Sequence, residues 1–452
     1  MTSSPATRPA RGGILSAPYT ATTIGVFALI AFNAFEIMAV TTVMPTISRD
    51  LGGFEMYALA FAAPLASAVV GMVAAGSWSD RHGPAGSLVA SLVLFTVGVL
   101  VSGLAPTMPV LVGSRVVQGL GTGALIVSLY VVVGVVYPAR LQPAVFATFA
   151  AAWVLPSLFG PGVAAVVADT LGWRWVFLGI VALVVLAAAL VAPVVRGLRR
   201  PTVGRQPVPR TQLLWAGIAA AAVLGIQLAE SRGGIPFAVL AAGVVVVALR
   251  PLTPPGTLHA ARGLPSVIGT RGMMSAAFFC GQAYIVLVLQ DRWGYSTGYA
   301  GIALTIVGVV WASLSQVQAR LGERVTSETA MRIGTSVLLV AMSGLWLTVR
   351  FEAPGMLAGV AFVVAGAGMG FGFSRTGVAM LASSSDQDRG FNSSALSIAD
   401  SIGAAAALSV CGIGFQLSRA VGADPFLTVF GVAVVCSVGA VVTATRTRLS
   451  PA

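Results

Sequence analysis

Residues 175–195 read WVFLGIVALVVLAAALVAPVV and carry no charge between Arg174 and Arg196. A helix needs about 20 apolar residues to cross the hydrocarbon core of a bilayer, and this run supplies them without a break. A membrane β-strand would instead alternate over about ten residues. The stretch therefore predicts a transmembrane α-helix.

The rest of the chain has the same character. Of its 452 residues, 57% are hydrophobic and only 9% are charged, whereas a soluble domain carries about 25% charged residues. So few charges cannot cover a water-exposed surface, which excludes a soluble enzyme, a nucleic-acid-binding domain and a disordered protein. The fold class that remains is an all-α polytopic membrane protein.

Apolar runs of similar length recur along the whole chain, and they predict fourteen transmembrane helices. The expected spans are 22–47, 54–77, 85–105, 108–136, 142–168, 174–195, 211–230, 234–250, 266–290, 297–320, 330–350, 355–382, 390–419 and 424–445. The eighth run is the shortest. Twelve full spans with a re-entrant hairpin at 211–250 are therefore the alternative topology.

Arginine predicts the orientation of the chain. The net charge is +12, and all 26 basic residues are arginine. With the N-terminus in the cytoplasm, about three times as many arginines lie in cytoplasmic segments as in outer ones, which is the bias that the positive-inside rule requires. Heavy use of Arg, Ala, Gly and Val is typical of a bacterium with a GC-rich genome. We therefore expect a multi-pass protein of the bacterial cell membrane with both termini in the cytoplasm.

The two halves of the chain resemble each other at an offset near 240 residues. The segment ISRDLGG at 47–53 resembles LQDRWGY at 289–295, and GLGTG at 119–123 resembles GAGMG at 366–370. Repeats of this kind are typical of transporters whose substrate site lies between them; a duplicated scaffold without transport is the alternative. The predicted organisation is a cytoplasmic tail at 1–21, a six-helix bundle at 22–195, a basic linker with two inserted helices at 196–265, a second six-helix bundle at 266–445 and a cytoplasmic tail at 446–452.

A loop motif gives the chain a family resemblance. The segment GSWSDRHG at 76–83 is similar to the G-x-x-x-D-R-x-G loop of the major facilitator superfamily, although Pro84 and Ala85 stand where that family continues with two basic residues. The residues that the resemblance assigns to this gating motif are Gly76, Asp80, Arg81 and Gly83.

Three further motifs resemble the proton-coupled drug-exporter branches of that superfamily. Arg115 and Gln118 match R-x-x-Q-G. Residues 156–165 resemble the antiporter motif G-x-x-x-G-P-x-x-G-G, with proline for its first glycine and two alanines for its last pair. Glu36 precedes Pro45 as an aspartate does in the first helix of the family. The resemblance covers about residues 22–445, points to the fourteen-helix branch, and assigns the antiporter motif to Gly160, Pro161 and Gly162.

Four charged residues lie deep inside the expected spans, away from the span ends: Glu36, Arg115, Arg375 and Asp400. Each costs roughly 2.5–3.5 kcal/mol in the middle of a membrane helix, so we expect them to face a cavity or one another. Depths counted along the helices predict the pairs Glu36–Arg115 and Asp400–Arg375. The functional hypothesis is proton coupling at Glu36 and Asp400. The alternatives are structural ion pairs and, for Arg375, snorkelling to the membrane surface.

A cavity for lipophilic compounds needs apolar walls and a few polar groups. The candidates are Asn33, Met38, Gln118, Tyr130, Trp153, Gln282, Tyr284 and Trp311. Each of them has an alternative role in facing lipid or a neighbouring helix. The three cysteines lie in separate apolar runs and predict neither a disulfide framework nor a zinc site.

The hypothesis that follows is a secondary transporter that exports lipophilic compounds in exchange for protons. The alternatives are a narrow exporter of one endogenous product, a lipid transporter, and a receptor or scaffold on a transporter fold. We expect no enzyme activity, no metal, no nucleic-acid partner and no bound cofactor, with energy from the proton motive force, because the chain lacks a phosphate-binding loop. We expect a monomer whose linker at 196–210 contacts anionic lipid headgroups.

Overall fold

The protein is described by a computed structural model that covers residues 13–17, 19–138, 141–197, 210–232, 234–321, 324–385 and 388–447. Within these ranges it has fourteen α-helices, two short 3-10 helices (Phe54–Met56 and Thr257–His259) and no strand. The predicted all-α membrane fold with fourteen helices is confirmed. Most of the basic linker between Arg196 and Arg210 lies outside the described residues.

The first six helices form one bundle. Within it α2 and α3 pack on α4, and α1 packs on α5 and α6. Their bounds are α1 Thr20–Asp50, α2 Tyr57–His82, α3 Pro84–Gly103, α4 Met108–Val136, α5 Gln142–Thr170 and α6 Arg174–Gly197.

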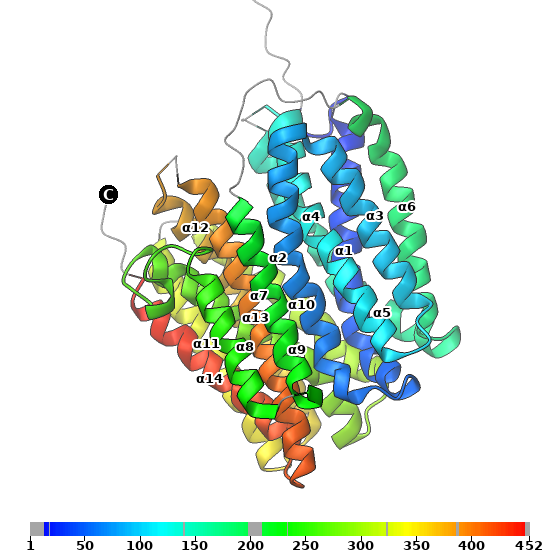
Figure 1. The fold of residues 1–452 in the computed structure, drawn as a ribbon, viewed down its shortest axis with the longest axis vertical. Helices are drawn as coiled ribbons and strands as arrows, with labels where there is room; N and C mark the ends of the chain where they lie inside the picture. The colour runs from blue at the N-terminus through cyan, green and yellow to red at the C-terminus, as the bar shows by residue number, and fades with distance from the viewer. Residues whose placement is uncertain are drawn as a thin grey trace, which may run out of the picture.

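The last six helices form a second bundle with related packing, in which α10 and α11 pack on α12, and α9 packs on α13 and α14. Their bounds are α9 Leu264–Trp293, α10 Thr297–Leu321, α11 Ser327–Arg350, α12 Gly355–Ala382, α13 Arg389–Ala420 and α14 Pro425–Thr445. The two bundles lie side by side (Figure 1) and meet along two seams, α2 with α13 and α5 with α10.

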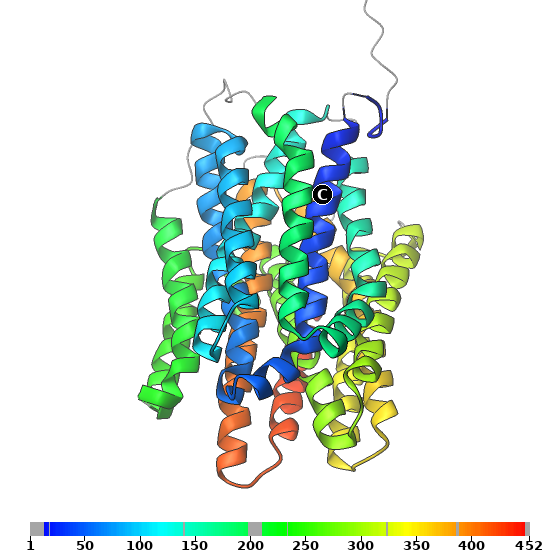
Figure 2. The ribbon, with the colours of Figure 1, turned by 90° about the vertical axis from the view of Figure 1, so that its right-hand side faces the viewer.

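The inserted helices α7 (Arg210–Arg232) and α8 (Gly234–Leu249) pack against each other, and α7 also lies against α2 and α13. Both views show the pair outside the bundles at this seam (Figures 1 and 2). Ser409 of α13 donates a 3.2 Å hydrogen bond to the main-chain carbonyl of Val223 on α7. Among the described residues, twelve helices are long and apolar enough to cross a membrane, and the apolar parts of α7 and α8 (Thr211–Ile226 and Pro236–Leu249) are shorter. The insertion therefore covers one seam and leaves the α5–α10 seam without such a cover.

Glycine on α4 allows its neighbours to approach closely. A methyl group at Gly123 would collide with the main chain at Ala68 of α2, and one at Gly121 would collide with the main chain at Phe95 of α3. In the second bundle Gly370 of α12 meets the main chain of α10 in the same way. The repeated glycine segments at 119–123 and 366–370 thus serve the same close packing of helices.

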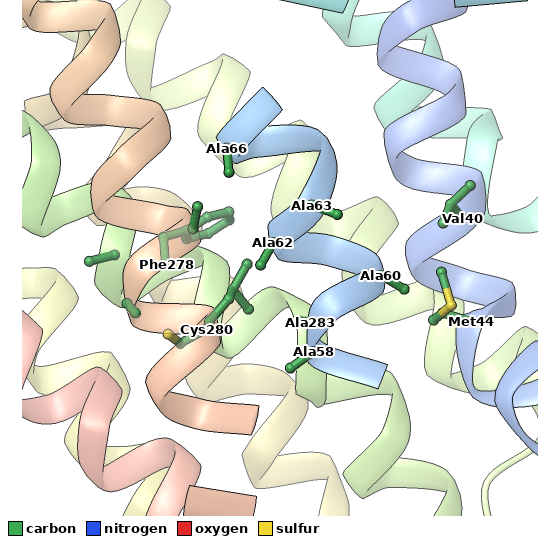
Figure 3. Close-up of a cluster of buried hydrophobic side chains, with 14 of the residues drawn as sticks. Val40, Met44, Ala58, Ala60, Ala62, Ala63, Ala66, Phe278, Cys280 and Ala283 are labelled. Carbon is green, nitrogen blue, oxygen red and sulfur yellow. The ribbon is translucent and has the colours of Figure 1, made fainter. Parts of the chain in front are cut away.

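Alanine on α2 lets helices of both bundles come together near the centre of the molecule. Figure 3 shows its segment from Ala58 to Ala66 between Val40 and Met44 of α1 on one side and Phe278 and Ala283 of α9 on the other. The labelled side chains are all buried. Small side chains here allow the first helices of the two bundles to share one apolar core with α2.

Candidate functional site

Glu36 and Arg115 form a buried ion pair in the first bundle. Arg115 on α4 donates to the carboxylate of Glu36 on α1 and to the side-chain carbonyl of Gln118, and its Nε donates to the carbonyl of Ala60 on α2 at 3.2 Å. The side chains of Arg115 and Glu36 are only 4% and 1% exposed. A charge pair taken out of water in this way is stable only when its polar atoms find partners, and here three helices supply them.

A second polar contact joins α1 and α4. Thr122 Oγ1 lies 3.3 Å from Oδ1 of Asn33, to which it donates, and both Asn33 and Gln118 are buried. The predicted pairing of Glu36 with Arg115 is therefore present, together with two polar candidates from the cavity list. Their role in proton coupling remains a prediction.

Asp400 has a different partner from the one that the sequence predicts. Its carboxylate on α13 pairs with Arg271 of α9, at 3.2 Å between Oδ2 and the guanidinium, and accepts a hydrogen bond from Ser275 of α9. Arg375 on α12 instead donates to the main-chain carbonyl of Gln318 on α10 at 3.5 Å. The prediction of an Asp400–Arg375 pair is wrong because α13 packs mainly on α9, whereas the Arg375 face of α12 meets α10.

In the sequence Arg271 falls near the start of the ninth apolar run, where an arginine is typical of the cytoplasmic boundary. In the structure α9 begins at Leu264, so Arg271 lies about 10 Å along the helix. Its guanidinium also donates to Thr376 Oγ1 at 3.1 Å and to the carbonyl of Phe373 at 3.2 Å, both on α12. Arg271 and Ser275 are thus site residues that the sequence analysis missed. The available signal was their spacing of four residues, which puts both side chains on one face of a helix.

The candidate cavity residues fall into two groups. Tyr130 and Trp153 are exposed, at 50% and 38%, and Met38 and Trp311 are partly buried. Gln282 and Tyr284 are buried between the bundles. The amide of Gln282 lies 3.5 Å from Thr41, to which it donates, and the ring of Tyr284 lies 5.2 Å from that of Tyr57. Only the first group is accessible in this conformation.

Contacts between the bundles gather at the end of the molecule where α1 and α9 finish. Arg49 pairs with Asp291 at 2.5 Å and donates to the side chain of Gln290 at 3.0 Å. The Tyr57 hydroxyl donates to the carbonyl of Ala283 at 2.5 Å. The two bundles are therefore held together at this end, while the accessible aromatic residues lie toward the other.

The antiporter motif lies where α5 meets both bundles. Gly160 faces Met38 of α1, and Pro161 lies against Gly301 of α10, whereas the Gly162 position faces open space. Pro161 thus lies at the α5–α10 seam, whereas Gly160 packs on α1 of its own bundle, and the role of the motif stays a prediction.

The loop motif forms the turn between α2 and α3. Gly83 ends α2 with φ of 84°, a conformation that only glycine adopts readily, and Pro84 begins α3. Gly76 lies within α2 and Arg81 is exposed. The side chain of Asp80 lies outside the described residues, so its predicted role stays a prediction.

Comparison with known proteins agrees with the fold. A family model described as the Major Facilitator Superfamily matches residues 26–408. A relative named a probable multidrug-efflux transporter, from Mycobacterium tuberculosis, is 28% identical over 421 residues, which cover 87% of this chain and 84% of the relative. A multidrug efflux pump of Staphylococcus aureus is 23% identical over 367 residues, which cover 78% and 80%.

Two solved structures share the architecture. A POT family transporter in complex with 5-aminolevulinic acid has a TM-score of 0.69 at 14% identity and covers 94% of each chain. A D-xylose–proton symporter has a TM-score of 0.65 at 16% identity and covers 93% of this chain and 97% of its own. At these identities the likeness shows the fold alone.

Proposed function

The chain belongs to the major facilitator superfamily, and we propose that it exports lipophilic small organic compounds from a bacterial cell in exchange for protons. It is a multi-pass membrane transporter and not an enzyme. The proposal adds the direction of transport, the coupling ion, the substrate class and the location of both termini in the cytoplasm.

The observation that carries the proposal is a pair of carboxylates, each held by an arginine inside its own bundle. Glu36 pairs with Arg115, and Asp400 pairs with Arg271. A buried carboxylate binds a proton more readily when it loses solvent and less readily when an arginine is beside it. Movement of either arginine therefore changes the proton affinity of its acid, which is the coupling that an antiporter needs.

Exchange follows if a proton and the bound compound compete for the same carboxylate. A proton arriving from outside neutralises the acid and weakens its hold on a bound compound, which is then released outside. Loss of that proton to the cytoplasm restores the negative charge and a site ready for the next compound. The multidrug-efflux names of the two bacterial relatives support this direction of transport and substrate class.

The test is accumulation of ethidium in energised cells that express the wild type, Glu36→Gln or Asp400→Asn, with and without a protonophore. We expect low accumulation only in energised cells that express the wild type, the Asp169→Asn control or Glu36→Asp, which keeps a carboxyl group. Asp169→Asn is the matched control, because Asp169 is exposed near the end of α5. Protein in the membrane is quantified for every variant.

Equal accumulation in wild-type cells and in cells without the protein would contradict broad export of cations and favour a narrow endogenous substrate. Export that survives the protonophore and both neutral substitutions would contradict proton coupling.

A further inference from the structure

We propose that Arg271 occupies the place of the substrate's cationic group, so that a planar organic cation binds by displacing it from Asp400 and Phe373. The inference builds on the proposed export of organic compounds and names the chemical class and the position of the cation. It also assigns Arg271 as a residue that determines specificity.

The surroundings of the Arg271 guanidinium are those of a cation site. Its central carbon lies 3.3 Å from the ring centroid of Phe373, where the face of an aromatic ring attracts a positive charge. Asp400 lies on one edge at 3.2 Å, and Thr376 accepts a hydrogen bond at 3.1 Å. Trp311 packs edge-on against Phe373, with ring centroids 5.3 Å apart. An acid, a hydroxyl and an aromatic face thus surround one flat cation.

This place is more exposed than the ion pair of the first bundle. The side chains of Arg271 and Asp400 are 17% and 26% exposed, against 4% and 1% for the pair in the first bundle. Contacts with Asp400 on α13 and with Phe373 and Thr376 on α12 place the guanidinium between helices of the second bundle. Arg271 also acts electrostatically on Tyr130 of α4 in the other bundle. The cation site is therefore only partly closed, and a ligand can approach it.

Arg271 is held less completely than Arg115. Its Nε is buried without a hydrogen-bond partner, whereas the Nε of Arg115 donates to the carbonyl of Ala60. A buried donor without a partner is destabilising, because it has lost its hydrogen bonds to water and gained none in the protein. A ligand cation without that donor avoids this cost, and the displaced arginine has only about 10 Å of helix between it and the start of α9 at Leu264. Exchange of Arg271 for a flat cation is therefore favoured over exchange of Arg115.

The first measurement is equilibrium binding of ethidium, a planar aromatic cation, to the purified full-length protein in lipid nanodiscs, followed by fluorescence. Arg271→Gln leaves Asp400 and Phe373 free for the dye, and we expect its affinity to rise about tenfold over the wild type. Arg271→Gln combined with Asp400→Asn should lose that gain. Arg332→Gln is the matched control, because Arg332 lies on α11 of the same bundle and donates to carbonyls at the end of α14.

The second measurement uses methylguanidinium, which has the head group of arginine. At millimolar concentration it should displace ethidium from Arg271→Ala and leave binding to the Arg332→Ala variant unchanged. Thermal unfolding of each sample shows that the variants are folded.

The outcomes separate this inference from the proposed function. Unchanged or weaker ethidium binding by folded Arg271→Gln overturns the inference, even if wild-type cells export the dye. A tenfold gain that disappears with Asp400→Asn supports it, even if the wild type does not lower dye accumulation in cells, a result that would contradict export alone.

Discussion

Glu36 and Arg115 place two opposite charges in a part of the protein that water does not reach. Removing one partner of such a pair leaves the other charged and unpaired, which costs about 3–5 kcal/mol. We therefore expect Arg115→Gln to lower the stability of the purified protein by about that amount. Thermal unfolding in detergent measures it.

The double variant Glu36→Gln/Arg115→Gln tests the reason for that loss. It leaves no isolated charge, so it should be more stable than Arg115→Gln alone. Arg332→Gln should stay near the wild type, because that arginine is only partly buried near the start of α11. A double variant as unstable as Arg115→Gln would show that shape, and not charge, holds α1 to α4.

Pairing of charged residues was partly predictable from the sequence. Glu36 and Arg115 each stand alone in an apolar run, so the cost of a lone buried charge predicts a partner. The same logic failed for Asp400, because Arg271 lies near the boundary of its run and looks cytoplasmic. Helix contacts decide between Arg271 and Arg375, and a single sequence does not contain them. A single sequence also does not predict the contact between Cys280 and Cys411, whose sulfur atoms are 3.3 Å apart although they come from distant apolar runs.

Helix α4 shows what the repeated glycine segments do for the elements. Gly123 has no room for a side chain against α2, whereas the Gly134 position on the same helix faces open space. We expect Gly123→Ala to destabilise the protein by about 1–3 kcal/mol, the usual cost of overpacking. Gly134→Ala is the matched control and should be neutral or slightly stabilising, since alanine is the better helix former. Apparent melting temperatures of both variants in detergent check this, and equal values would contradict the packing explanation.

The helices themselves were the most predictable part of the fold. Continuous apolar runs give the number and order of the helices directly, because a bilayer demands about 20 apolar residues for each crossing. The position of α7 and α8 was not predictable, since two apolar helices could pack equally well against any lipid-facing side of the bundles. The structure places α7 against α2 and α13, so the inserted pair contacts both bundles. Any relative motion of the bundles must therefore slide α7 along one of these two helices.

Three ion pairs at the end where α1 and α9 finish reflect the internal repeat of the molecule. Asp50 at the end of α1 pairs with Arg174 at the start of α6, at 3.2 Å. Arg292 at the end of α9 pairs with Asp424, which caps α14. These pairs occupy equivalent places in the repeat with their charges reversed. The neighbouring Arg49 and Asp291, at 2.5 Å, form the pair that joins the bundles to each other. The repeat of ISRD at 47–50 and LQDR at 289–292 contains this arrangement, with arginine and aspartate in opposite order.

The pair between Arg49 and Asp291 should bias the protein toward the conformation that is closed at this end. Its side chains are 44% and 36% exposed, and exposed pairs contribute about 0.2–1 kcal/mol. Arg49→Ala should therefore raise the population that is open at this end by no more than about fivefold. The buried hydrogen bond from Tyr57 to Ala283 remains in that variant and keeps the closed form present.

Distances between spin labels at Glu55→Cys and Ser296→Cys, one on each bundle, measure these populations when the three native cysteines are replaced by alanine. We expect Arg49→Ala to increase the share of long distances, and Arg49→Ala/Tyr57→Phe to increase it further. Arg174→Ala is the matched control, because it breaks a pair of similar exposure inside one bundle. If Arg174→Ala shifted the distances as much as Arg49→Ala, the effect would come from surface charge in general. The Arg49–Asp291 pair would then have no special part in holding the bundles together.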